Sequence, residues 1–356
     1  MDFRTELKDL AGEVTTEVVK ALRAELDRSQ KISPLIAEAV EEIIPQAEGG
    51  KRIRGALMIK GYELCGGTDR KEIMKAAVFI ELIQIYLLIH DDFMDDDNLR
   101  RGVPTMHTRY EQIHKQRYQR RDARHFGQSI AICAGDVISH LAHEILLSAG
   151  FPADRHVKAL QIMERQLQLV GYGQMLDVFT EVREDVTEEE ILQLHRLKTG
   201  VYTYETPLLV SATLAGANDD QKRVLSEFAV PTGITFQIQD DMLGIYGTED
   251  KLGKPVGSDL KEGKYTLLMH KAFEMGNPAQ IKRLKELNGK SDITFSEVEE
   301  ARVLIKETGS YQYSVDLAHK YIKQSQQILS SYDGFPGKQA QEFLQGMAQY
   351  MLDREY

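Results

Sequence analysis

The sequence lacks the features that mark secreted and multidomain proteins. It has two cysteines, Cys65 and Cys133, which form no CxxC pair, and its nine prolines and 27 glycines form no proline-rich or glycine/serine-rich stretch. We therefore expect one domain over residues 1–356 rather than domains joined by a flexible linker. Both cysteines lie among apolar residues, which predicts a reduced, cytoplasmic protein with inert, buried thiols.

The sequence also shows no pattern typical of a signal peptide or of a membrane span. Residues 1–26 are acidic and amphipathic, without the basic and then apolar segments that direct secretion. The longest apolar run, Ala76 to Ile89, is interrupted by Glu81 and Gln84 and is too short for a bilayer. We expect no transmembrane segment. The net charge of -11 disfavours nucleic acid as a main partner.

Strand signals are scarce, and apolar residues instead recur with the period of a helix over long stretches. We predict an all-α fold with an N-terminal helix within residues 1–30. Asp69 and Glu72 have the spacing of a capping box at the start of the fourth helix. The predicted helices cover residues 3–29, 31–44, 52–65, 69–97, 128–149, 155–179, 187–215, 219–244, 264–275, 279–288, 296–307, 310–331 and 336–352.

Positive charge gathers between Arg109 and Arg124, within a segment, residues 102–127, that we predict to be a basic loop. Such a segment is either solvated surface or a basic rim that attracts an anionic substrate. The sequence leaves both interpretations open.

Aspartates are concentrated in two short motifs about 150 residues apart. The first acidic motif is HDDFMDDD, residues 90–97, and the second acidic motif is QIQDD, residues 237–241. Carboxylates at a helix C-terminus are disfavoured by the helix dipole and by one another, so a cation should offset them. Asp91 and Asp95 share one helical face, and magnesium, which also takes water and phosphate oxygens, fits them well. A solvated acidic helix end is the alternative.

Basic residues that could bind phosphate accompany both motifs. The segment GGKRIR, residues 49–54, combines flexible glycines with three positive charges at a predicted helix N-terminus, which suits phosphate. Acidic and basic groups in this combination indicate a diphosphate bridged by magnesium. The other basic or polar candidates are Arg100, Arg101, Lys198, Thr199, Lys254 and Lys264.

Taken together, GGKRIR, HDDFMDDDNLRRG, KTGVYTYETPL and FQIQDDMLGIYGTEDKLGKPVGSDLKEGKYT resemble the signature motifs of trans-isoprenyl diphosphate synthases, the polyprenyl synthetase family. The resemblance extends over residues 30–356. It implies an isoprenoid synthase-type helical bundle around a deep central cavity, with the two acidic motifs facing each other at its mouth. It also implies a homodimer.

The resemblance assigns roles by position in the motifs. It implies about three Mg2+ ions per active site, with the metal ligands Asp91, Asp92, Asp95, Asp240 and Asp241, of which Asp91, Asp95 and Asp240 are the direct ones. Isopentenyl diphosphate, the homoallylic substrate, is assigned to Lys51, Arg54, Gln84 and Arg101. The allylic diphosphate is assigned to Arg100, Lys198, Thr199, Gln237, Lys254 and Lys264. Gln174 and Asp177 match a motif near the reacting carbons.

Two positions depart from the family pattern. Gly244 replaces the third aspartate of the second acidic motif, which leaves that motif with fewer carboxylates. Gly55 stands where a proline often follows the first basic motif, which affects the start of the helix more than the chemistry.

The implied chemistry is ionisation of an allylic carbon–oxygen bond. Magnesium and lysines would stabilise charge on the departing diphosphate, and an apolar wall with the dipoles of Thr199, Gln237 and the carbonyls near Lys198 would surround the allylic cation. The double bond of isopentenyl diphosphate then attacks head to tail, and a proton is lost to the released diphosphate. This residue pattern requires no nucleophilic side chain.

Product length is predicted from the helix that ends at Asp91. Tyr86 lies about 7.5 Å upstream along the axis, with Leu87 and Ile83 near the same face, so Tyr86 would form a floor beneath the growing chain. By resemblance this favours the twenty-carbon geranylgeranyl diphosphate, with fifteen-carbon farnesyl diphosphate next. Ordinary core packing of Tyr86 is the alternative.

Two other functions remain open. A class I terpene cyclase also uses an aspartate motif and magnesium, but it does not need Lys51 and Arg54 for isopentenyl diphosphate. A non-catalytic regulatory subunit of a heteromeric prenyl synthase typically has a degraded acidic motif, whereas both motifs are usable here.

Overall fold

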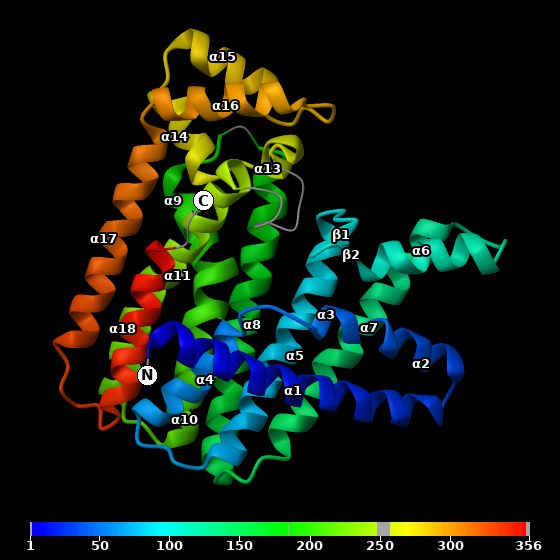
Figure 1. Cartoon of the computed structure of the whole chain (residues 1–356), viewed down its shortest axis with the longest axis vertical. Helices are drawn as coiled ribbons and strands as arrows, with labels where there is room; N and C mark the ends of the chain where they lie inside the picture. The colour runs from blue at the N-terminus through cyan, green and yellow to red at the C-terminus, as the bar shows by residue number, and fades with distance from the viewer. Residues whose placement is uncertain (1, 184, 248–256, 354–356) are drawn as a thin grey trace. The chain divides into compact units, whose positions relative to one another are not determined.

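The computed structural model describes residues 2–183, 185–247 and 257–353, and nearly all of its elements are helices (Figure 1). The chain divides into two compact units: unit 1 comprises Met1–Ile59 and Thr68–His156, and unit 2 comprises Lys60–Gly67 and Val157–Tyr356. The all-α prediction is confirmed. The expectation of a single synthase domain stays a prediction.

Unit 1 is built around two long antiparallel-packed helices. Its elements are α1 (Phe3–Gln30), α2 (Pro34–Glu41), α3 (Ile44–Ala47), α4 (Ile53–Leu64), which ends in unit 2, α5 (Arg70–Met94), β1 (Leu99–Arg100), β2 (Val103–Pro104), α6 (Met106–Arg117) and α7 (Ala123–Leu147). Contacts between α5 and α7 are the most extensive of the unit. Gly135 of α7 permits this approach, because a Cβ there would lie 2.3 Å from the ring of His90.

Helix α5 begins and ends differently from the prediction. Asp69 caps it by accepting the N–H of Glu72 at 3.2 Å, but the Glu72 carboxylate binds Lys75 and the N–H of Gly150 instead of completing a capping box. The helix ends at Met94, not at residue 97. The reason is Asp96, whose φ of 56° lies outside the helical region.

The prediction of a basic loop over residues 102–127 is wrong. This stretch contains β2, all of α6 and the start of α7. The apolar face of α6, formed by Met106, Tyr110 and Ile113, packs on α7, and a high density of charged residues on the other face conceals the helical period. Asp122 then caps α7 by accepting the N–H of His125 at 2.7 Å.

By length and composition alone, α5 and α7 could each cross a membrane, with mean hydropathy of 1.7 and 1.5 over their most apolar stretches. Within the protein, 61% of that stretch of α5 and 39% of that of α7 are buried. A core helix passes the same test, so the expectation of no transmembrane segment stays a prediction.

Unit 2 continues from α8 (Ala153–Glu181), which begins in unit 1. Its further elements are α9 (Glu188–Leu194), η1 (His195–Glu205), α10 (Thr206–Ala215), α11 (Asp219–Tyr246), α13 (Ser258–Glu262), α14 (Leu267–Met275), α15 (Pro278–Leu287), α16 (Phe295–Glu307), α17 (Ser310–Ser330) and α18 (Lys338–Leu352). Helix α11 lies at the centre of this unit and packs on η1 and α17.

The helix predicted over residues 187–215 is three segments. Between α9 and α10, the chain forms the π-helix η1, whose wider turns are uncommon and occur frequently at functional sites. Gly200 of η1 and Gly233 of α11 explain how the two helices meet, because a Cβ on Gly233 would lie 2.3 Å from the Cα of Gly200. Their backbones are therefore in direct contact.

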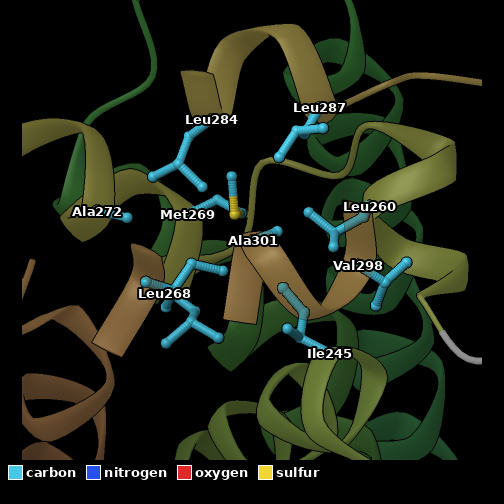
Figure 2. Close-up of a cluster of buried hydrophobic side chains, with 10 residues drawn as sticks. Ile245, Leu260, Leu268, Met269, Ala272, Leu284, Leu287, Val298 and Ala301 are labelled. Carbon is cyan, nitrogen blue, oxygen red and sulfur yellow. The ribbon is translucent and has the colours of Figure 1, made fainter. Parts of the chain in front are cut away.

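An apolar core holds the helices from α13 to α16 together (Figure 2). Leu268 and Met269 of α14 and Leu284 of α15 point toward Ala301 of α16, and all four are almost fully buried. This core anchors the C-terminal end of α11, which carries the second acidic motif, through Ile245.

Candidate active site

The first acidic motif lies at the C-terminal end of α5 in unit 1. Asp95 is the C-cap residue of α5, and its N–H donates a hydrogen bond to the carbonyl of Asp91 at 2.9 Å. Both residues are half-buried, and their four-residue spacing places them on one side of the helix end.

Asp92 is set apart by burial, with 1% of its surface exposed. Its Oδ1 atom accepts hydrogen bonds from the Arg100 guanidinium, whereas its Oδ2 atom is buried without a hydrogen-bond partner. Burial raises the pKa of Asp92 to about 6, although the charge of Arg100 opposes this rise. Asp92 thus holds Arg100 beside the motif.

The β1–β2 hairpin positions Arg100 and Arg101. Arg100 pairs with Val103 across the hairpin, and the two turn residues, Arg101 and Gly102, have φ values of 53° and 77°. Positive φ at both central residues is the geometry of a two-residue hairpin turn. Arg101, a non-glycine residue, adopts it at a cost in free energy, which the surrounding structure must offset.

Arg101 lies against the basic segment of residues 49–54. Its Nη2 atom would be 3.0 Å from a Cβ on Gly50, so glycine at this position makes room for the guanidinium. Partial burial and the positive charges of Arg52 and Arg100 lower the pKa of Arg101. Guanidinium groups that repel one another would be stabilised by an anion such as a diphosphate.

The structure thus brings together part of the set that the sequence assigns to isopentenyl diphosphate. Arg54 is close enough to Arg101 to lower its pKa further. Lys51 is exposed at the start of the segment, and Gln84 is half-buried on α5, two turns before Asp91 and on the same face.

A buried ion pair, missed by the sequence analysis, supports this segment. Arg52 Nη1 donates to Glu81 Oε2 at 3.0 Å, and both side chains are 4% exposed. Glu81 also accepts the N–H of Gly55 at 2.8 Å, while Arg52 Nε donates to Thr15 at 3.0 Å. A glutamate inside an apolar run was the available signal, because a charge there needs a partner.

In unit 2, η1 carries Lys198 and Thr199. The Lys198 ammonium forms an ion pair with Asp177 of α8. Gly173 of α8 allows α8 to pack closely against η1, because a Cβ there would lie 2.5 Å from the backbone nitrogen of Lys198. On the same helix, Gln174 keeps a buried Nε2 atom without a hydrogen-bond partner, so its amide is poised to donate to a bound molecule.

A hydrogen-bonded chain connects η1 to the second acidic motif on α11. Thr199 donates to Gln237 Oε1 at 2.6 Å, and Gln237 Nε2 donates to Asp241 Oδ1 at 2.8 Å. His195 Nε2 lies 3.1 Å from Asp241 Oδ2, and both residues are buried. Asp241 is therefore held inside the protein, whereas Asp240 is half-buried at the surface of α11. His195 is a second residue that the sequence analysis missed.

The remaining lysines differ in position. Lys264 is half-buried and lies 3.1 Å from Glu262. Lys254 lies outside the described residues.

Within residues 2–183, 185–247 and 257–353, no three acidic, histidine or cysteine side chains converge into a metal site by themselves. A hard cation that takes two or three carboxylates and completes its shell with water and substrate oxygens fits such an arrangement. The unpartnered Oδ2 of Asp92 and the adjacent Asp91 and Asp95 are oxygen donors of the kind magnesium prefers.

The residues predicted to set product length line one stretch of α5. Ile83 is fully buried, and Tyr86 and Leu87 are half-buried. The Tyr86 ring meets the His90 ring edge-on, with 4.9 Å between centroids. His90 Nε2 in turn lies 3.1 Å from the carbonyl of Ile132, so Tyr86 rests on a fixed partner.

Comparison with known proteins shows the family to which the chain belongs. The family model for polyprenyl synthetase matches residues 33–305. Geranylgeranyl diphosphate synthase of Methanosarcina mazei is 34% identical over 93% of this chain and 98% of its own length. Geranylfarnesyl diphosphate synthase of Natronomonas pharaonis is 32% identical over 86% of this chain and 87% of its own.

A solved structure extends the likeness to the fold. Geranylgeranyl pyrophosphate synthase from Corynebacterium glutamicum, complexed with isoprenyl diphosphate and magnesium, superposes with a TM-score of 0.92 at 27% identity over 100% of both chains. The fold is thus that of the all-α isoprenoid synthases. The chain belongs to the polyprenyl synthetase family.

Removing Glu81 tests the supporting ion pair. Glu81→Ala leaves the Arg52 guanidinium buried without its carboxylate, so we expect the free energy of unfolding to fall by about 3–5 kcal/mol, measured by urea denaturation. The matched control is Glu17→Ala, which breaks an exposed pair with Lys20 and should cost about 0–1 kcal/mol. Equal losses in the two variants would contradict the supporting role.

Proposed function

We propose that this protein condenses isopentenyl diphosphate with allylic diphosphates, head to tail, to a short-chain all-trans prenyl diphosphate. The proposed product is geranylgeranyl diphosphate, with farnesyl diphosphate next. The observation that carries the proposal is full-length similarity to geranylgeranyl diphosphate synthases in a chain that keeps the carboxylates and cations of both acidic motifs. The chain is a prenyltransferase.

Lys51, Arg54 and Arg101 would bind the diphosphate of isopentenyl diphosphate, and the mutual repulsion at Arg101 supports this role. Gln84 would contact the same substrate. Arg100, positioned by Asp92, would bind the allylic diphosphate.

Bound magnesium would offset the charge of the aspartates and of the departing diphosphate. Lys198, oriented by Asp177, would stabilise the negative charge that grows as the carbon–oxygen bond breaks. Lys264 and Lys254 would add to this stabilisation.

Thr199 and Gln237 are suited to the allylic cation. The Thr199 hydroxyl donates its proton to Gln237, which leaves the lone pairs of the Thr199 oxygen available to face positive charge. Gln237 is fixed by its bond to Asp241. After attack by the double bond, the proton would leave to the released diphosphate, so no side chain is needed as a base.

The two alternatives are less well supported. A terpene cyclase has no need for the guanidinium cluster of Arg52, Arg54 and Arg101 beside a glycine-lined segment. A regulatory subunit would not need the hydrogen-bonded chain from Thr199 to Asp241.

The proposed activity is tested by incubating the protein with isopentenyl diphosphate and each allylic starter, with and without magnesium. We expect magnesium-dependent products that give fifteen- or twenty-carbon alcohols on dephosphorylation and chromatography.

Asp91→Asn with Asp95→Asn should lower kcat/KM by about 100-fold or more. Asp220→Asn, an exposed aspartate on α11, is the control. Cyclic hydrocarbons formed without isopentenyl diphosphate would indicate a cyclase. Turnover that requires a partner chain would indicate a regulatory subunit.

Tyr86→Ala tests the proposed floor. Removing the ring opens space beside α5, so we expect products longer than those of the unsubstituted enzyme, seen as later-eluting alcohols. Tyr332→Ala, a half-buried tyrosine between α17 and α18, removes the same volume elsewhere and should leave product length unchanged. Unchanged products with Tyr86→Ala would mean that Tyr86 only packs the core.

We also propose that the enzyme is a soluble, cytoplasmic homodimer. Exposed apolar residues on α8 support the homodimer, because Tyr172, Met175 and Phe179 lie on one face and are 50%, 62% and 59% exposed. In unit 1, Ile132 of α7 is also exposed. Exposed apolar residues that follow one face of a helix are typical of a protein interface.

Met175→Glu with Phe179→Glu should convert the dimer to a monomer, because burying two carboxylates in an apolar interface is unfavourable. Molar mass measured by light scattering checks this. Phe295→Glu with Val303→Glu changes two exposed apolar residues of α16 and should leave the mass unchanged. An unsubstituted protein of monomer mass would contradict the proposal.

A further inference from the structure

An apolar cavity in unit 1 is lined by none of the residues assigned to the substrates. It has a volume of about 840 Å³, within the roughly 300–1,000 Å³ of small-molecule pockets. Its walls come from α2, α6, α7 and the turn between α6 and α7. The apolar lining residues are Leu35, Ile36, Val40, Ile113, Phe126 and Ile130.

The rim of the cavity is positively charged. Arg120 and Arg121 line it, are exposed, and form no hydrogen bond or ion pair through their side chains with any described residue. The one acidic lining residue, Glu38, is neutralised by Arg117 at 2.8 Å. An apolar interior beneath two uncompensated guanidinium groups matches a molecule with an apolar tail and an anionic head.

The turn that carries these arginines is held in place. The carbonyl of Arg120 accepts a hydrogen bond from His114 Nε2 at 2.9 Å, and the His114 and Phe126 rings pack at 5.1 Å between centroids. Arg121 has a φ of 69°, an uncommon conformation for a residue with a side chain. The rim is therefore pre-formed, which lowers the entropic cost of binding.

A second observation also indicates a missing occupant. Tyr110 lines the cavity and is 5% exposed, yet its hydroxyl has no hydrogen-bond partner. A buried hydroxyl without a partner is costly. A bound molecule with an oxygen atom would accept a hydrogen bond from this hydroxyl.

We propose that this cavity is a second binding site for a prenyl diphosphate, with the isoprenoid tail against α2, α6 and α7 and the diphosphate on Arg120 and Arg121. The identity of the ligand rests on the proposed function, since the enzyme would itself make such a molecule. The site gives a role to Arg120 and Arg121, whereas Arg109, Lys115, Arg117 and Arg124 of the same segment pair with acidic side chains.

Cys133 provides a probe of occupancy. It lines the cavity and is exposed, which corrects the expectation that both thiols are buried. Burial raises the pKa of Cys65 to about 12, so that thiol reacts slowly. The rate at which a maleimide modifies Cys133 is measured with a chelator present, which removes the divalent metal that prenyl diphosphates need at the acidic motifs.

Geranylgeranyl diphosphate should slow modification of Cys133 about tenfold at saturation. Geranylgeraniol and inorganic diphosphate, which carry only the tail or only the head, should protect far less. Arg120→Ala with Arg121→Ala should raise the concentration for half-protection by about tenfold or more. Lys320→Ala with Lys323→Ala removes the same charge from α17 and should change nothing.

Three outcomes would overturn the proposal: protection that survives loss of both arginines, equal protection by geranylgeraniol, and a Cys133 that is unreactive before any ligand is added. The last would mean that a second copy of the chain covers the cavity. Arg120→Ala with Arg121→Ala should retain synthase turnover. Failure of the proposed function would instead appear as absence of prenyl products in the unsubstituted enzyme, so the two failures are distinguishable.

Discussion

Charges that are removed from water and must be paired determine the geometry around both acidic motifs. A carboxylate or guanidinium removed from water is stable only beside an opposite charge or several hydrogen bonds. Glu81 and Arg52 satisfy this condition beneath the basic segment, and Asp92 pairs with Arg100 beside the first acidic motif. In unit 2, the half-buried Asp177 and Lys198 pair in the same way. Each pair joins two different segments of the chain. The pairing of charges and the packing of these segments therefore favour the same positions of the side chains.

The five aspartates assigned to magnesium divide into two kinds. Asp92 and Asp241 are almost fully buried and hold neighbouring side chains. Asp91, Asp95 and Asp240 are half-buried and remain the better candidates for direct metal ligation. Gly244 lies one helical turn after Asp240, on the same face of α11. The missing third carboxylate would therefore have stood beside Asp240.

Much of the fold and the motif chemistry could be predicted from the sequence, since both depend on local pattern. Helical period gave α1, α5 and α11 within a few residues, and the spacing of Asp91 and Asp95 placed them on one face. The π-helical form of η1 could not be predicted, because it depends on contacts with Gly173 and Gly233, which are distant in sequence. Helix α6 was missed because its charged face masks the apolar one. His195 and Arg52 acquire partners only through tertiary packing.

The β1–β2 hairpin joins two chemically opposite regions of unit 1. Arg100 binds the carboxylate of Asp92, and its immediate neighbour Arg101 lies among the guanidinium groups beside Gly50. Consecutive Cα atoms are about 3.8 Å apart whatever the rest of the chain does. The turn is therefore a covalent spacer of fixed length between an anionic and a cationic region. A single inserted residue would change that spacing without altering any side chain.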